Sequence, residues 1–197
     1  MIDYDVRKIK CMEAKEFIVQ HHYSRGSAYR PSPCYGLFDG DNLIGCLMIA
    51  VPCSERVRAS VFGIEYKNHV KELHRLAIID DTPKNTESWF ISRCLKLLRE
   101  DDERLWALVS FADPTQGHEG VIYKASNAYY YGRSSKSRFY LDGEGGLRHP
   151  RQCGVNISMK AAKEKGWEPV MREGKHRYLF ILGNKSQKRN RRKMVIV

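Results

Sequence analysis

Residues 105–109 (LWALV) form a continuous apolar run, which indicates a short strand buried on both faces. The strand ends in SFAD at 110–113, and Pro114 then stops ladder pairing because it has no backbone N–H. Ligands of open α/β sheets bind beyond the carboxyl ends of the strands. The run therefore predicts a central strand whose open end carries the carboxylate of Asp113.

A helix is expected after this strand. The segment GHEG at 117–120 marks its start, and within it Tyr123, Asn127 and Tyr130 recur at i, i+4 and i+7, so they share one face. This spacing places a polar, aromatic stripe beside the carboxylate. The alternative stays open that Asp113 caps a turn and the tyrosines pack in a core.

The composition is that of a soluble globular protein. A chain of 197 residues fits one domain with a tail, which we place at 1–184 and 185–197. No apolar run reaches the length of a membrane span and no signal-peptide core precedes the first strand, so we predict a cytoplasmic protein. The six cysteines form no CxxC pair and the histidines have no ligand spacing, so we predict reduced thiols and no metal site.

The charge of the chain predicts a polyanionic partner. The formal net charge is +11, and a balance this basic is typical of proteins that bind nucleic acid. The alternative for the basic tail is a solvated appendage. The basic side chains that we expect to contact phosphates are Arg25, Arg30, Lys188, Arg189, Arg191 and Arg192.

The order of the expected elements is β-α-β-β-β-α-β-α-β-β, which is the order of the acetyltransferase (GNAT) fold. We therefore predict an α/β (α+β) domain with a central mixed, mostly antiparallel sheet flanked by helices. DGDN at 39–42 is a hairpin signal, and an early helix has Ala14, Phe17, Ile18 and His21 on one face. The expected strands are 3–10, 34–38, 42–51, 71–79, 105–109, 137–141 and 176–182, and the other helices are 87–99 and 158–165.

Three ordered motifs carry a sharper resemblance. HHYS at 21–24, LHRL at 73–76, and FAD at 111–113 with GHEGVIYKASN at 117–127 resemble the Mom family of phage DNA-modification proteins. The similarity fades after about residue 132. It implies a GNAT-like enzyme that converts adenine in double-stranded phage DNA to an N6-carbamoylmethyl derivative and so blocks host restriction. Because a base inside a duplex is unreachable, the adenine must be flipped out.

The resemblance implies five site residues. Asp113 is expected to be the general base, directly or through His22, and Tyr23 and Tyr123 are expected to donate to the oxyanion or to the leaving group. Arg75 is expected to line the site and to pair with an anion, either Asp113 or a phosphate.

Further side chains are weaker candidates. His118 can serve as a second base, and Ser110 and Asn127 flank the same segment. His21 is expected in the core rather than in the site. The aromatic residues that can stack on a flipped adenine are Phe111, Tyr29 and Tyr35.

The acyl donor is a separate question. Acetyltransferases that use coenzyme A carry a Gly-rich loop for the pyrophosphate, whereas residues 80–86 read DDTPKNT, with two acids, a proline and no glycine. This sequence disfavours coenzyme A and favours glycyl-tRNA as donor, which makes tRNA a partner. Two other functions stay open: an ordinary acetyl-CoA-dependent N-acetyltransferase of a protein or small amine, and a non-catalytic nucleic-acid-binding module.

Overall fold

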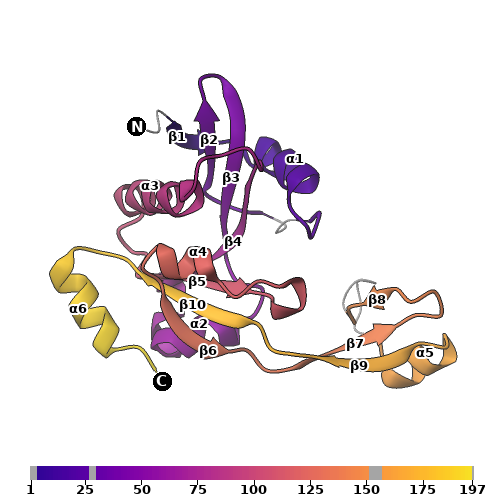
Figure 1. Cartoon of the computed structure of the whole chain (residues 1–197). Coiled ribbons are helices and arrows are strands. Elements are labelled where there is room, and N and C mark those ends of the chain that lie inside the picture. Colours follow the sequence, from indigo (N-terminus) through magenta and orange to yellow (C-terminus); the bar gives the residue numbers. More distant parts are fainter. Residues whose placement is uncertain (1–3, 27–29, 151–156, 197) are drawn as a thin grey trace. The chain divides into compact units, whose positions relative to one another are not determined.

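The chain is arranged as two compact units, which are described separately (Figure 1). The structure, a computed structural model, describes residues 4–26, 30–150 and 157–196. The first unit comprises Met1–Phe111, Gly120–Tyr131 and Arg177–Val197, and the second comprises Ala112–Glu119 and Gly132–His176. Along the sequence, the second unit therefore interrupts the first twice.

A seven-stranded sheet forms the first unit, in the order β1-β2-β3-β4-β5-β10-β6. The pairs from β1 to β4 are antiparallel and β4 pairs parallel with β5, so the sheet is mixed, as predicted. The strands are β1 Asp5–Ile9, β2 Cys34–Asp39, β3 Asn42–Ala50, β4 Val70–Ile78, β5 Ala107–Ala112, β6 Tyr129–Arg133 and β10 His176–Ile181.

Helices accompany these strands. The helices of the first unit are α1 Cys11–His21, α2 Glu55–Phe62, η1 Ile64–His69, α3 Thr86–Asp101, α4 Val121–Ala125 and α6 Lys185–Lys193, where η marks a 3₁₀ helix. In Figure 1, α1 and α3 flank the β2–β3 hairpin on either side. The hairpin itself turns at the predicted DGDN segment, where Asp39 pairs with Asn42 and Gly40 has a φ of +56°.

Strand alternation divides the core between α1 and α3. Ala14, Phe17 and Ile18 of α1 pack against Cys34, Cys46 and Met48 on one face of the sheet. Tyr35 follows Cys34 and so points to the opposite face, where its hydroxyl donates to the Asp101 carboxylate at the end of α3, 3.2 Å away. The helical spacing of the apolar residues thus buries both faces of the hairpin.

The same alternation places α2 and α4 on opposite faces of β10. Leu179 and Ile181 pack in one cluster with Val61 and Phe62 of α2. Tyr178 and Phe180 face the other way and contact the ring of Tyr123 on α4, with centroid separations of 5.4 and 6.1 Å. Because β10 is buried on both faces, these alternating residues hold α4 in a fixed position on the sheet.

The pairing around β4 is irregular at the centre of the sheet. Ile49 pairs with Leu73 and Met48 pairs with Arg75, so His74 is an extra residue in a β-bulge. On the other side, the parallel register of β4 with β5 ends where Glu72 pairs with Val109. Beyond this point β4 stays paired with β3 but no longer pairs with β5.

The second unit contains a three-stranded antiparallel sheet in the order β8-β7-β9. Arg172 of this sheet lies with its guanidinium carbon 4.9 Å from the centre of the Phe139 ring. The elements of the unit are η2 Pro114–Gln116, β7 Ser137–Leu141, β8 Leu147–Arg148, α5 Met159–Glu164 and β9 Glu168–Arg172.

Most elements expected from the sequence are confirmed, but two expectations are wrong. The helix after β5 ends at Ala125, Asn127 has a left-handed φ of +61°, and β6 begins at Tyr129, so Tyr123, Asn127 and Tyr130 form no helical stripe. His21 is exposed and stacks on Phe17, with ring centroids 4.4 Å apart, instead of lying in the core. The segment expected as a basic tail, residues 185–197, begins with the helix α6, and the domain boundary at 184 stays a prediction.

The cysteines of the described part of the chain are free thiols. Cys34, Cys46 and Cys94 are buried, and burial raises the pKa of Cys34 to about 12 and that of the other two as well. These thiols therefore act as small apolar core residues, as predicted. Cys153 lies outside the described residues. Within the described ranges, no helix is both long enough and apolar enough to cross a membrane.

Candidate functional site

The turn that follows α1 is organised by His22. The backbone N–H of Ser24 donates to Nδ1 of His22 over 3.1 Å, and the Ser24 hydroxyl lies 2.9 Å from the same atom. Because a backbone amide can only donate, Nδ1 is an acceptor and the ring proton lies on Nε2. The ring of Tyr23, which is about half exposed, lies against His22 with centroids 4.3 Å apart.

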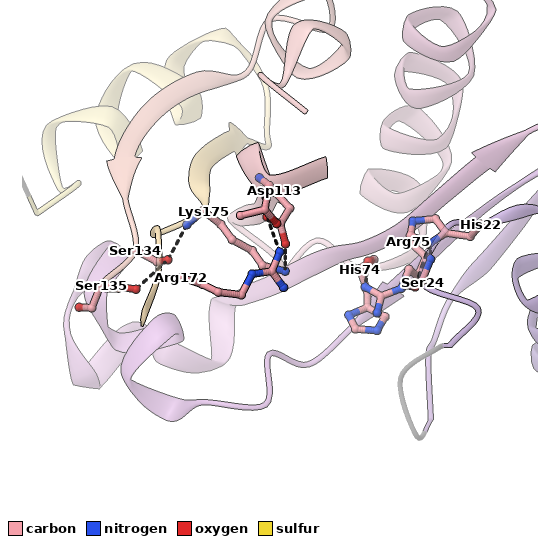
Figure 2. A network of polar contacts seen from close by, with 10 residues as sticks. His22, Ser24, His74, Arg75, Asp113, Ser134, Ser135, Arg172 and Lys175 are labelled. Atoms are coloured by element: carbon pink, nitrogen blue, oxygen red, sulfur yellow. Dashed lines mark hydrogen bonds and ion pairs between the residues drawn. The ribbon is translucent and has the colours of Figure 1, made fainter. Parts of the chain in front are cut away.

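Arg75 ties this turn to the β4 bulge. Its Nε donates to the Gly26 carbonyl oxygen over 2.9 Å, and its Nη1 donates to the His74 carbonyl oxygen over 2.7 Å. Figure 2 shows His22, Ser24, His74 and Arg75 as one group. Within the first unit, these backbone carbonyl oxygens are the hydrogen-bond acceptors of Arg75, and its pairing with an anion, either Asp113 or a phosphate, stays a prediction.

Ser110 and Tyr123 lie where β4 and β5 part. The Ser110 hydroxyl donates to the Leu73 carbonyl oxygen over 3.3 Å, and Ser110 is also hydrogen-bonded to the Tyr123 hydroxyl. This contact lowers the pKa of the Tyr123 phenol and so opposes the effect of burial. Ser110 is fully buried, so this chain of hydrogen bonds is shielded from water.

The environment keeps the Tyr123 phenol protonated. Burial raises its pKa above the ordinary value of 10.0, and the nearby charges of Tyr23 and Glu72 act in the same direction. Ser110 and Arg75 oppose this shift without cancelling it. Tyr123 is therefore within electrostatic reach of both the turn after α1 and the β4 bulge, and it is a proton donor at neutral pH.

Four of the predicted site residues thus converge with Ser110 in the first unit. They are His22, Tyr23, Arg75 and Tyr123, and each is fixed by contacts within that unit. Asp113 and His118, which were also predicted as site residues, belong to the second unit.

The Asp113 carboxylate is anchored by the second unit. It is buried, caps η2 by accepting from the Thr115 N–H and hydroxyl over 3.1 and 2.6 Å, and lies 3.2 Å from the Lys175 ammonium. Arg172 lies 3.5 Å from the same carboxylate, as Figure 2 shows. Burial acts to raise the pKa of Asp113, but Thr115 and Lys175 together outweigh it and lower the pKa. Asp113 therefore caps a turn and also holds a charge cluster.

The weaker candidates separate into exposed and buried residues. His118 is exposed and donates its backbone N–H to the Asp113 carbonyl oxygen over 3.2 Å, and Asn127 is exposed. Of the residues considered for stacking, Tyr35 is fully buried and cannot meet a base. Phe111 packs at the edge of the cluster around α2, and Tyr29 lies outside the described residues.

The C-terminal helix uses part of its charge internally. Arg191 donates to the Leu182 carbonyl oxygen over 2.6 Å and lies 5.2 Å from the ring centre of Trp106. Burial lowers the pKa of Arg191. Arg192 lies 4.5 Å from the ring centre of Tyr129, whereas Arg189, like Arg25 and Arg30, has an exposed side chain.

The loop between β4 and α3 does not fit a pyrophosphate. Asp80 and Asp81 are exposed carboxylates, and Asn85 at the helix start has a left-handed φ of +73°. The Thr86 N–H, which opens the helix, already donates to the Pro83 carbonyl oxygen over 3.2 Å. Two negative charges and an occupied amide oppose the binding of a diphosphate at this helix end.

Two residues near this site escaped the sequence analysis. Glu72 and His74 lie at the bulge of β4, with a Glu72 carboxylate oxygen 3.1 Å from Nδ1 of His74. Their spacing of two along a predicted strand would have placed both on one face, which is the signal that was available. Among the described residues, no three His, Cys, Asp or Glu side chains gather in a metal-binding group.

A model of the Mom protein family matches residues 3–196 of this chain. The chain is also 31% identical over 192 residues to the protein named methylcarbamoylase mom of Escherichia phage Mu, an alignment that covers 93% of this chain and 78% of that protein.

Solved structures agree with the fold. A GNAT-family acetyltransferase from Streptococcus pneumoniae has a TM-score of 0.51 at 9% identity, covering 92% of this chain and 100% of that one. An acetyltransferase of Bacillus subtilis in complex with CoA has a TM-score of 0.50 at 10% identity, covering 91% and 98%. At such low identities these likenesses establish the GNAT fold alone.

Proposed function

The chain belongs to the Mom protein family, and from that membership we propose that it is a GNAT-like acyltransferase that modifies adenine in phage DNA. The proposed product is N6-carbamoylmethyladenine. The enzyme would act in the cytoplasm of the host cell, and the modification would protect the phage DNA from restriction.

One observation carries this proposal. Tyr123, Ser110, Arg75 and the His22–Tyr23 turn meet at the open end of the two central strands, where α/β enzymes bind their substrates. All of them come from a single unit of the chain, so their arrangement does not depend on the second unit.

The proposed chemistry needs a base and a proton donor. The exocyclic amine of adenine is a weak nucleophile because its lone pair is delocalised into the ring, so a base must remove a proton as the new bond forms. The carbonyl oxygen of the donor becomes negatively charged at the same time. Tyr123 suits this oxygen because its raised pKa keeps the phenol protonated, and the half-exposed Tyr23 can donate from the side of the solvent.

We assign glycyl-tRNA as the acyl donor. The N6-carbamoylmethyl group has the atoms of glycinamide, so a glycyl group supplies its carbon and nitrogen atoms without an oxidant or reductant. The loop at 80–86 opposes a diphosphate, whereas a net charge of +11 suits both tRNA and DNA. The adenine must leave the DNA stack to reach the open end of β4 and β5.

Nucleoside mass spectrometry of DNA from cells that express this chain tests the proposal. We expect N6-carbamoylmethyladenine with the natural chain and a loss of about 10²-fold or more with Tyr123→Phe, which removes one oxyanion donor. Tyr140→Phe, a buried tyrosine of the second unit, is the matched control and keeps the product. DNA without any modified adenine in the presence of folded protein would refute the function.

An acetyl-CoA-dependent N-acetyltransferase is the second candidate, because the Bacillus subtilis structure of the same fold holds CoA. Calorimetric titration with coenzyme A separates the two. We expect no saturable binding by this chain, since the loop before α3 carries the exposed carboxylates of Asp80 and Asp81, which repel a pyrophosphate. Saturable binding of coenzyme A in the micromolar range would favour this second candidate.

A further inference from the structure

The β4 bulge displays a histidine that the proposed function has not yet used. His74 is the extra residue between the Leu73–Ile49 and Arg75–Met48 pairs. Bulges next to active sites re-aim a side chain relative to a regular strand. Arg75 fixes this bulge by donating to the His74 carbonyl oxygen, and the same guanidinium holds the turn after α1 through the Gly26 carbonyl oxygen.

Glu72 sets the tautomer of the His74 ring. The Glu72 carboxylate lies 3.1 Å from Nδ1 of His74, and an ionised carboxylate only accepts hydrogen bonds. Nδ1 must therefore carry the ring proton, which leaves the lone pair on Nε2. The two side chains are 13% and 16% exposed, so the pair is shielded from water on most sides.

The Nε2 atom of His74 is a buried hydrogen-bond acceptor. It is inaccessible to solvent and has no hydrogen-bond partner among the described residues. A buried polar atom without a partner destabilises the folded state, so it requires an explanation. A base that substrate binding uncovers, and that meets its proton donor only then, supplies that explanation.

The pair of Glu72 and His74 lies among the residues of the proposed site. Glu72 and Arg75 both act electrostatically on the Tyr123 phenol, so the bulge lies near the proposed oxyanion donor. In Figure 2, His74 lies beside Arg75 and the Ser24 turn. All these groups are in the first unit.

Two of the bases considered from the sequence, His22 and Asp113, are less suited to this step because of their own contacts. Nδ1 of His22 already accepts from Ser24, so its ring proton is on Nε2, and the remaining nitrogen donates instead of accepting. The Asp113 carboxylate accepts from Thr115 and pairs with Lys175, and its lowered pKa makes it a weaker base.

We propose that His74 is the general base of the acyl transfer and that Glu72 is the positioning residue that holds its imidazole; this inference rests on the proposed function. Nε2 takes a proton from the exocyclic amine of adenine as the nitrogen bonds to the acyl carbon and the carbonyl electron pair moves to oxygen. When the intermediate collapses, the bond from the acyl carbon to the ester oxygen of the donor breaks. The imidazolium then gives its proton to that oxygen.

The experiment compares three variants by single-turnover modification of DNA, with mass spectrometry of the nucleosides. We expect His74→Gln to lower the rate about 10²–10⁴-fold, the usual contribution of a general base. Glu72→Gln lowers the rate less, because the ring remains but loses its orientation. His69→Gln is the matched control, since this histidine stacks on Trp106 and contacts Arg104 instead of the bulge, and it keeps the natural rate.

Two further measurements separate a base from a structural residue. Added imidazole should restore part of the rate to His74→Gly and none to Tyr123→Phe. In ¹⁵N NMR spectra of the folded protein, His74 should show a protonated Nδ1 and a bare Nε2, and Glu72→Gln should mix the tautomers.

The outcomes distinguish this inference from the proposed function. If the natural chain modifies adenine and the folded His74→Gln variant does so at the same rate, the proposed function stands. The role of His74 as the general base is then refuted. A proton on Nε2 in the NMR spectrum overturns it independently of activity. A natural chain that leaves adenine unmodified overturns both.

Discussion

At Gly120 the backbone takes a left-handed φ of +71°, and a Cβ built on it would overlap the ring of Tyr178. Tyr178 is buried and cannot move aside without disturbing β10. We expect Gly120→Ala to destabilise the protein by about 2–4 kcal/mol, the sum of the backbone cost and of overpacking. Urea denaturation measures it, and Gly117→Ala is the control.

Gly117 has the same φ of +71° but open space at its Cβ position. Its replacement should cost only the backbone part, about 1–2 kcal/mol. Equal effects of the two substitutions would show that the Tyr178 ring gives way. A larger effect at Gly120 would show that the ring holds α4 in place.

The second prediction at this scale concerns Asp113 and pH. Its pKa is lowered below the ordinary 3.8 by Thr115 and Lys175 against the opposing effect of burial, so the ionised carboxylate stabilises the folded state above that value. This stability is lost as the pH falls through the lower pKa of the folded state. Asp113→Asn should therefore cost about 1–2 kcal/mol at pH 7 and progressively less below about pH 4.

Unfolding curves of the natural chain and Asp113→Asn between pH 7 and pH 2.5 measure this difference. Lys136→Gln is the control, because its ion pair with Glu173 is exposed and should contribute little at any pH. A difference for Asp113→Asn that stays constant down to pH 2.5 would contradict the charge cluster.

Residue-level sequence analysis predicted which residues the fold brings together better than it predicted the contacts of each residue. The motifs predicted His22, Tyr23, Arg75 and Tyr123, which the fold gathers near Ser110. The partner of Arg75 could not be predicted, because period-two spacing assumes a regular strand and the bulge at His74 breaks it. The roles of Asp113 and His118 stay predictions, since the structure gives only their contacts within the second unit.

At the scale of elements, α6 divides its basic residues between packing and solvent. Lys188 and Arg189 lie on the turn before Arg191, whose guanidinium is bound to Leu182 and lies over Trp106. We expect the double change Lys188→Gln with Arg189→Gln to weaken binding to all DNA sequences alike. The slope of log affinity against log salt should become shallower by about 0.9 for each lost phosphate contact.

Arg191→Ala is the contrasting variant, with an expected loss of stability of about 1–2 kcal/mol from its hydrogen bond and its cation–π contact. Fluorescence anisotropy at several salt concentrations and urea denaturation separate the two effects. An unchanged salt slope for the double variant would show that α6 serves only to pack the first unit.

Elements with a clear period or turn signal were predictable, and short polar ones were not. The hairpin at Asp39–Asn42 and the helix α3 carry DGDN and an apolar face, and both are confirmed. Helix α6 has no apolar face of its own, and its capping box of Asn184 and Gln187 was the available signal. β9 has no alternation of buried and exposed residues, since Glu168–Arg172 are almost all exposed, and it is a strand because it pairs with β7.

At the scale of the whole molecule, the chain leaves the first unit after Phe111 and after Tyr131 and returns each time. The first return brings α4 and Tyr123, and the second brings β10, on which α4 packs. The expected boundary at 184 stays a prediction, but the segment beyond it belongs to the first unit. The N–H of Ile196 donates to the Val61 carbonyl oxygen over 3.0 Å, and the Tyr131 hydroxyl donates to the Ile196 carbonyl oxygen over 2.7 Å.

The last prediction concerns the route of the glycyl nitrogen. Transfer of a glycyl group to adenine first gives an amide whose carbonyl carbon is bonded to N6. Its free amine can then attack C6 through a five-membered ring, which is favoured because the reaction is intramolecular. The bond from C6 to the original nitrogen breaks, that nitrogen takes the proton released by the glycyl amine, and the product is the carbamoylmethyl isomer. No atom is gained or lost in this second step.

This route assigns each nitrogen a place that can be measured. In cells supplied with ¹⁵N-glycine, the label should lie on C6 of the modified adenine, and the original exocyclic nitrogen should be the terminal carboxamide. Fragmentation of the nucleoside by tandem mass spectrometry separates the two positions. In the His74→Gln variant the same isotopomer should form more slowly, since one base serves both steps. A carboxamide that carries the glycine nitrogen, or a product without label, would exclude this route and return coenzyme A to first place among the donors.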